Sequence, residues 1–235
     1  MNYSEAWPGG PKFIYTGDAP LLTTDTVLLA DFARLRARGL CADIGTGSGA
    51  LILLLAKKYP GCRFYGFELI PDAARSAEAN LELNGLSSRA EIITGDVTET
   101  HRLLERGSFD SLVSNPPYFP PTSNPSPYAS RNFARRGLEI EELCAAASYL
   151  LKNGGSFSLI YRTERLAELF RAMSNHGIEP KRLRLFAKNA AAPPLLALVE
   201  GMLLAKPSLK IEPTLFQKNE DGSETSEYMR INHRL

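Results

Sequence analysis

Short apolar runs alternate along the chain with longer segments in which apolar residues recur every three or four positions. The runs predict buried strands, and the longer segments predict amphipathic helices. From residue 40 onward the expected strands are 40–44, 63–69, 90–96, 109–115, 156–161, 182–187 and 194–205. The expected helices between them are 50–59, 71–85, 97–107, 138–155 and 163–177. Strands and helices that alternate at this spacing predict a mostly parallel sheet with helices on both faces.

The last two expected strands are connected differently. Only residues 188–193 separate them, which is too short for a helical crossover. We therefore expect 182–187 and 194–205 to pair antiparallel at the edge of the sheet. The prediction is a doubly wound, Rossmann-like α/β fold with seven strands, mostly parallel, and an antiparallel last strand.

We expect three parts along the chain. Residues 1–39 contain the helical segment "LLTTDTVLLADFARLRARG" and form an N-terminal strap and helix of the same domain. Residues 40–205 form the main domain. Residues 206–235 are polar, and "EDGS" within them predicts a turn in a hairpin or tail.

Composition and charge exclude some classes of protein. The chain has 235 residues, 44% of them hydrophobic, and a net charge of +1, so no global basic field indicates nucleic acid, although a local basic patch would suffice. Cys41, Cys62 and Cys144 are too widely spaced to predict a disulfide framework or a zinc site. No segment resembles a signal peptide or reaches membrane-spanning length. We expect a cytoplasmic protein without a metal, a membrane or an obligate protein partner.

Glycines and acids gather where the first strands end. The stretch "DIGTGSG" places Gly45, Gly47 and Gly49 between a strand and a helix, where the backbone can turn sharply and approach a ligand. The GxGxG spacing differs from the GxGxxG of dinucleotide-binding folds, and no GK[ST] follows. Glu68 ends the second strand and Asp96 lies at the end of the third. Each signal alone fits a tight turn or a solvated strand end, but in a parallel sheet all three converge on one crevice.

This combination resembles class I S-adenosylmethionine-dependent methyltransferases, over roughly residues 40–205. The resemblance implies S-adenosylmethionine as the cofactor, with the glycine loop beneath its methionine part. It also implies that Glu68 binds the ribose and that Asp96 reaches the adenine amino group. The antiparallel last strand matches this family and not the nicotinamide-binding folds. The residues that the resemblance places at the cofactor are Asp43, Gly45, Thr46, Gly47, Gly49, Glu68, Leu69, Asp96, Val97 and Asn115.

The tetrapeptide "NPPY" follows the fourth strand and resembles the motif of methyltransferases that modify the exocyclic nitrogen of adenine or the side-chain amide of glutamine. Such a nitrogen is a poor nucleophile because its lone pair is delocalised. Hydrogen bonds to the Asn115 side-chain oxygen and the Pro116 carbonyl would favour a more tetrahedral nitrogen, with Pro117 holding the turn rigid and Tyr118 stacking on the target. The alternative is a rigid turn with Tyr118 in the core, and Phe119 fits packing as well as substrate contact.

The segment "TTDTVLLADFA", residues 23–33, resembles the helix start of the bacterial tRNA (valine) adenine-N6 methyltransferase family, as do "EPKRLRLF" and "LLALVEG". This resemblance implies methyl transfer to the N6 atom of an adenine in tRNA, with Thr24 and Asp25 over the methionine end of the cofactor. A plain helix cap is the alternative for these two residues. A glutamine protein methyltransferase, a ribosomal RNA amino-methyltransferase and a non-catalytic RNA- or nucleotide-binding module remain open as functions.

A 19-residue segment rich in proline and serine, "FPPTSNPSPYASRNFARRG", follows the tetrapeptide. Loops of this length beside an active site are often functional. We expect its arginines to contact RNA phosphates and its aromatic rings to stack on a base, a solvated loop being the alternative. The side chains concerned are Tyr128, Arg131, Phe133, Arg135 and Arg136.

Overall fold

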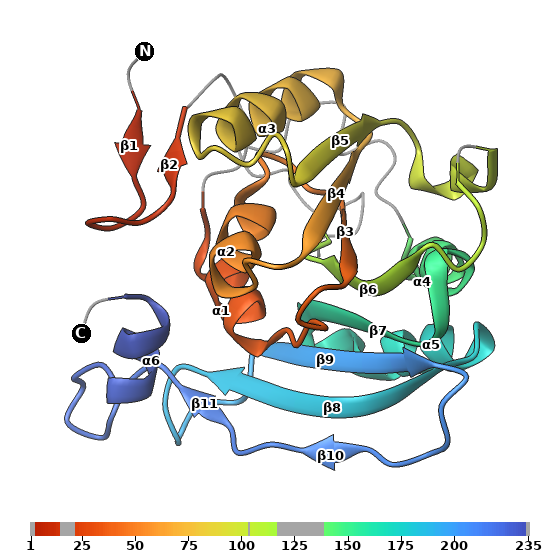
Figure 1. Ribbon diagram of the computed structural model, residues 1–235. Coiled ribbons are helices and arrows are strands. Elements are labelled where there is room, and N and C mark those ends of the chain that lie inside the picture. Colours follow the sequence, from red (N-terminus) through yellow and green to blue (C-terminus); the bar gives the residue numbers. More distant parts are fainter. Residues whose placement is uncertain (1–2, 15–21, 103, 117–138, 234–235) are drawn as a thin grey trace.

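The computed structural model describes residues 3–14, 22–102, 104–116 and 139–233 (Figure 1). The seven predicted strands all form in one sheet. They are β3 (Leu40–Ile44), β4 (Arg63–Glu68), β5 (Ala90–Thr94), β6 (Phe109–Ser114), β7 (Leu151–Arg162), β8 (Ile178–Ala187) and β9 (Leu196–Leu203). The shorter strands are β1 (Ser4–Glu5), β2 (Lys12–Phe13), β10 (Lys210–Ile211) and β11 (Leu215–Phe216).

Across the sheet the strand order is β10-β8-β9-β7-β6-β3-β4-β5, and β11 also pairs with β8. Neighbours from β5 to β7 are parallel, whereas β9 is antiparallel to both β7 and β8. This confirms the predicted doubly wound α/β fold with its antiparallel last strand. The two short strands β10 and β11, which run parallel to β8, were not predicted.

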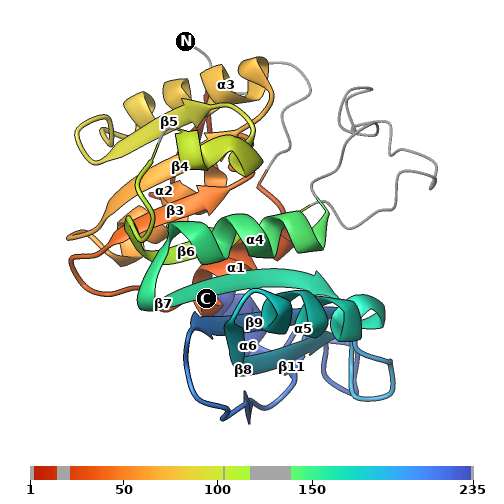
Figure 2. The same ribbon diagram turned by 90° about the vertical axis from the view of Figure 1, so that its right-hand side faces the viewer.

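Helices cover both faces of the sheet. They are α1 (Thr24–Phe32), α2 (Ala50–Lys58), α3 (Pro71–Leu83), α4 (Ile140–Leu150), α5 (Leu166–Asn175), α6 (Ser226–Ile231) and the 3₁₀ helices η1 (Val97–Arg102) and η3 (Thr163–Arg165). Helices α1, α2 and α6 share one hydrophobic cluster, while α4 and α5 share another with η1. Figure 2, in which the right-hand side of Figure 1 faces the viewer, shows α4 and α5 toward the front.

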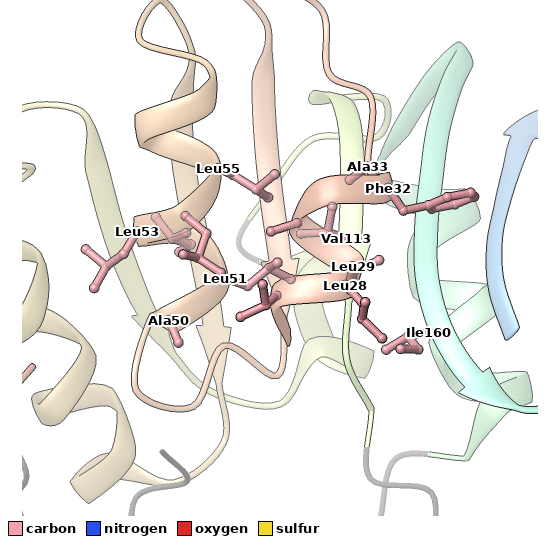
Figure 3. Close-up of a cluster of buried hydrophobic side chains, with 14 of the residues drawn as sticks. Leu28, Leu29, Phe32, Ala33, Ala50, Leu51, Leu53, Leu55, Val113 and Ile160 are labelled. Carbon is pink, nitrogen blue, oxygen red and sulfur yellow. The ribbon is translucent and has the colours of Figure 1, made fainter. Parts of the chain in front are cut away.

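Alternating strand residues supply these two clusters. Cys41 faces the first cluster and Ala42, the next residue of β3, faces the second. Figure 3 shows Leu28 and Leu29 of α1 beside Val113 of β6 and Ile160 of β7. Helix α1 is therefore fixed over the middle of the sheet, which matters for the site described below.

Several predicted boundaries were wrong. Helix α4 ends at Leu150 and β7 begins at Leu151, so the glycines at 154–155 lie inside a strand and do not end a helix. The predicted helix 97–107 is a short 3₁₀ helix, η1. Strand β8 begins at Ile178, where the chain tolerates Pro180 because the pairing with β9 is irregular between Pro180 and Arg182.

Both ends of the described chain are tied to the main body. Asn84, the C-cap of α3, binds the backbone of Lys12 through both polar atoms of its amide, at 2.9 and 2.7 Å. At the other end, a bridge between Lys218 and Glu224 closes a turn, and the ring of His233 stacks on Trp7 at a centroid distance of 3.8 Å. Within the described ranges, no helix has the length and apolar character needed to cross a membrane.

Candidate functional site at the carboxyl ends of the strands

Four parallel strands end at the same edge of the sheet. Pairing aligns Ile44 of β3 with Phe67 of β4, and Glu68 with Thr94 of β5, while Asp43 aligns with Val113 of β6. The chain leaves β3 toward β4 and later returns to β6 on the other side of β3. Such a reversal opens a crevice that binds ligands in open α/β sheets. The predicted site residues that follow these strands are thereby brought together.

The glycine loop turns over the ends of β3 and β4. Gly45, Gly47 and Gly49 have φ angles of +76°, +57° and +78°, a region that other residues adopt at a cost. The backbone N–H groups of Gly45 and Thr46 donate to the carbonyl of Phe67 at 2.9 and 3.0 Å. Helix α2 starts directly after Gly49. The loop therefore sets the first turn of α2 at the crevice, where its backbone dipoles favour an anionic or hydroxyl-bearing ligand.

Glu68 is buried beneath this loop, with 1% of its surface exposed. One carboxylate oxygen accepts the N–H of Gly47 at 2.8 Å and the other accepts that of Ile70 at 2.9 Å. A carboxylate offers about four acceptor positions, and these two N–H groups use one on each oxygen. Leu69, the next residue, is 50% exposed although it is large and apolar. A carboxylate next to an exposed apolar side chain is a combination that suits a ribose, for Glu68, and the flat face of a base, for Leu69.

Asp43 lies deeper, at the end of β3, and is 2% exposed. The pKa of its carboxyl is raised from 3.8 to about 7, chiefly by burial; a hydrogen bond from Thr46 opposes the shift and the nearby Glu68 adds to it. That bond runs from Thr46 Oγ1 to Asp43 Oδ2 over 2.7 Å. Asp43 therefore fixes the conformation of the glycine loop from below.

Asp96 follows β5 and adjoins the same crevice. The backbone N–H of Gly95 donates to the carbonyl of Glu68 at 2.9 Å, which joins the two strand ends. The Asp96 carboxylate accepts the backbone N–H and the hydroxyl of Thr98 at 2.9 and 2.7 Å. This local turn starts η1, whose first residue, Val97, is buried.

Asn115 follows β6 on the other side of β3. The preceding Ser114 donates its hydroxyl to the carbonyl of Ile44 at 2.8 Å, which ties the end of β6 to the end of β3. The side-chain Nδ2 of Asn115 donates to Thr26 Oγ1 at 3.2 Å. Thr26 lies in the first turn of α1 together with Thr24 and Asp25. The predicted cofactor residues of α1 are thus in the same helical turn as the residue that contacts Asn115.

Three polar residues that support this arrangement were missed by the sequence reasoning, namely Thr26, Ser114 and Asn80. Asn80 is fully buried on α3 and donates to the carbonyl of Ser48 in the glycine loop at 3.0 Å. Its side-chain oxygen accepts the N–H of Ile14 at 2.8 Å. The sequence does carry a signal, because Asn80 falls on the apolar face of an amphipathic helix, where an amide needs partners.

The remaining predicted residues are only partly covered by the structure. Pro116 is described and buried. Outside the described residues lie Pro117, Tyr118, Phe119, Tyr128, Arg131, Phe133, Arg135 and Arg136. In the part of the chain that is described, no group of three histidine, cysteine or acidic side chains is placed to hold a metal ion, and the three cysteines are free and buried.

Comparison with known proteins places these features in a family. Residues 22–176 match the family model described as the methyltransferase small domain. The tRNA1(Val) (adenine(37)-N6)-methyltransferase of Porphyromonas gingivalis is 39% identical over 162 residues, which cover 66% of this chain and 63% of that protein. The protein of the same name from Bacteroides fragilis is 31% identical and is matched over 75% of this chain and 74% of its own length.

Solved structures agree on the fold. A predicted O-methyltransferase from Agrobacterium tumefaciens has a TM-score of 0.73 at 23% identity, covering 89% of this chain and 96% of its own. TrmN from Thermus thermophilus has a TM-score of 0.57 at 21% identity, covering 76% of this chain and 48% of its own. The match to the Porphyromonas gingivalis relatives spans slightly less than two thirds of their length. With a family model matched over more than half of its length, the chain belongs to the methyltransferase small domain family.

Proposed function

We propose that this chain transfers the methyl group of S-adenosylmethionine to the N6 atom of an adenine in tRNA. The observation that carries the proposal is the position of Asn115, the first residue of "NPPY", at the end of β6 and next to the switch point of the sheet. The curated relatives named as tRNA1(Val) adenine-N6 methyltransferases, at 31–39% identity, support the choice of reaction and substrate.

The residues around the crevice fit the proposed cofactor. The glycine loop offers a close approach to backbone, Glu68 has acceptor positions for hydroxyl groups, and half-exposed Leu69 offers an apolar surface for a base. We assign the adenine amino group to Asp96 and the methionine end to Thr24 and Asp25, following the family resemblance. S-adenosylmethionine, when bound, supplies a methyl group on a cationic sulfur, which is a strong electrophile.

Asn115 and Pro116 prepare the amine that accepts the methyl group. Asn115 uses Nδ2 to contact Thr26, so Oδ1 is the atom of this amide that can accept a substrate N–H. The Pro116 carbonyl is the proposed acceptor for the second N–H. Two acceptors in these positions draw both N–H bonds out of the plane of the base and return lone-pair density to the nitrogen. The contribution of the protein is thus orientation and electrostatics, without a general base of raised pKa.

Replacing Asn115 by alanine tests this role. The Asn115→Ala variant should bind S-adenosylmethionine within about twofold of wild type by calorimetry, and its methyl transfer should fall by about 100-fold or more, as expected when an orienting contact is lost. Asn175→Ala is a matched control, because Asn175 is exposed on α5, where its side-chain amide donates to Glu141. A variant of Asn115 that transfers at the wild-type rate would contradict the assignment.

We further propose a tRNA substrate held by the arginine-rich segment after "NPPY", in a cytoplasmic setting that suits three free cysteines. Arg135→Glu combined with Arg136→Glu should weaken tRNA binding by about tenfold or more, since each lost phosphate contact lowers affinity, and leave cofactor affinity unchanged. The control is Arg38→Glu combined with Arg63→Glu, which changes the net charge by the same amount. These two arginines are exposed and lie at the amino ends of β3 and β4, away from the crevice. Equal tRNA affinity of the two double variants would refute the role of the segment.

A further inference from the structure

The first turn of α1 meets the end of β6 through a chain of side-chain hydrogen bonds. Asn115 Nδ2 donates to Thr26 Oγ1 at 3.2 Å. Thr26 Oγ1 lies 3.0 Å from Thr23 Oγ1, the N-cap of α1, which also accepts the backbone N–H of Thr26 at 3.3 Å. The chain thus runs from the proposed catalytic amide to a helix cap.

The chemistry of the amide fixes the direction of the first bond. An amide nitrogen only donates, so Thr26 Oγ1 is the acceptor in its contact with Asn115. The single hydroxyl hydrogen of Thr26 is then available to Thr23 Oγ1. As long as Thr26 accepts, the Asn115 amide presents its nitrogen to α1, and Oδ1 is the polar atom that this contact does not use.

Thr26 is held in a fixed position. It is 8% exposed, and its β-branched side chain has few rotamers within a helix. Helix α1 is packed on the sheet through Leu28 and Leu29 (Figure 3). At its other end, the ammonium group of Lys58 donates to the carbonyls of Ala30, Asp31 and Ala33 at 3.0, 2.6 and 3.2 Å.

We propose that Thr26 is a positioning residue that sets the orientation of the Asn115 amide, so that Oδ1 and not Nδ2 meets the substrate amine. This inference rests on the proposed function, because it gives the amide oxygen its task there. It assigns a role to a helix residue for which no contact with cofactor or substrate is proposed. Without the Thr26 hydroxyl the Asn115 amide group can rotate so that Oδ1 and Nδ2 exchange places. The Nδ2 donor then faces the substrate amine, which is itself a donor.

The first test measures orientation without any reaction. The side-chain amide signals of Asn115 in a nitrogen–proton correlation spectrum are assigned from their loss in Asn115→Ala. In Thr26→Val, which keeps the shape but removes the acceptor, these two signals should shift and their protons should exchange faster with water. Thr26→Ser should restore the wild-type positions. Signals that are the same in Thr26→Val and wild type would overturn the inference.

The second test measures transfer. Thr26→Val should lower kcat by about tenfold or more with an unchanged cofactor Kd, as a small misplacement of an orienting group does, and Thr26→Ser should recover it. In the Asn115→Ala background the Thr26→Val change should have no further effect, because Thr26 acts through Asn115. Thr225→Val is the matched control: its hydroxyl caps α6 and contacts the carbonyl of Phe216 at 2.7 Å, and its loss should leave kcat unchanged.

The outcomes separate the two proposals. An effect of Thr26→Val that persists in Asn115→Ala, or a kcat equal to wild type, would contradict positioning through Asn115. A wild-type protein that methylates no RNA or protein overturns the proposed function together with the kinetic part of this inference. In that case the spectrum still decides whether Thr26 holds the amide.

Discussion

Replacing Asp43 by asparagine should remove a large part of the pH dependence of folding. The carboxyl is buried at the end of β3, and its pKa is raised from 3.8 to about 7, chiefly by that burial. Between these two values the folded protein holds a proton that the unfolded chain has released. The contribution of the protonated Asp43 carboxyl to the stability of the folded state is therefore full below pH 3.8, and it is lost as the pH rises through 7.

The size of the effect follows from the two pKa values. A separation of this size between the folded and unfolded states corresponds to about 4 kcal/mol of unfolding free energy across the window. Asparagine has the same shape, and its side-chain oxygen can still accept the hydroxyl of Thr46. The Asp43→Asn variant should therefore fold, and its unfolding free energy should fall with rising pH by about 4 kcal/mol less than that of wild type.

Urea denaturation of both proteins between pH 4 and pH 8 measures this difference, and titrations common to both proteins cancel in it. Thr46→Val gives an independent check. It removes the hydrogen bond that lowers the Asp43 pKa, so the loss of stability should move to higher pH. Parallel pH profiles for wild type and Asp43→Asn would refute the reasoning, because they would mean that Asp43 titrates alike in the folded and unfolded states.

Three further substitutions test other parts of the structure. Arg182→Met removes the guanidinium that pairs with buried Glu200 at 3.2 Å. It should lower the free energy of unfolding, measured by urea denaturation, by about 3–5 kcal/mol. A stability equal to wild type would contradict this. Gly66→Val places a Cβ where 2.8 Å separates it from the Thr46 methyl group beneath the glycine loop. The substitution should lower the free energy of unfolding by about 1–3 kcal/mol and weaken S-adenosylmethionine binding. An unchanged affinity by calorimetry would show that the loop does not depend on this contact. Asn80→Leu leaves backbone groups of the glycine loop and of the residue after β2 unpaired, and should lower stability by about 1–3 kcal/mol, which a wild-type melting temperature would contradict.

Most of the sheet could be predicted because its strands are short apolar runs between helices of regular period. The runs at 40–44 and 63–68 appear at almost the predicted bounds. The boundary between α4 and β7 could not be predicted, since "LKNGG" has the composition of a helix end. Gly154, at a φ angle of +72°, instead continues a strand whose register is set by the pairing with β6. That pairing is a tertiary property.

The C-terminal elements were missed for a related reason. Strands β10 and β11 have two residues each, and only their pairing with β8 makes them strands. Helix α6 has six residues, too few for a periodic signal, although Thr225 is a recognisable cap. Its buried residues Tyr228 and Ile231 join the cluster below α1.

The residues of the candidate site could be predicted from their positions along the strands. Asp43, Glu68, Asp96 and Asn115 all lie at the carboxyl ends of predicted strands, and the topology alone brings such residues to one edge. The contacts between elements were not predictable, because Thr26 and Asn115 are 89 residues apart in the chain. A threonine in the first turn of a helix gives no sign that its hydroxyl meets an amide.

The central claim is the transfer of a methyl group to adenine N6 in tRNA, and one measurement tests it directly. The protein is incubated with labelled S-adenosylmethionine and unmodified bulk tRNA, and the digested RNA is separated into nucleosides. The label should appear in N6-methyladenosine and should be absent when Asn115→Ala is used. Label in another nucleoside, or label only in ribosomal RNA or in a protein glutamine when these are offered instead, would contradict it.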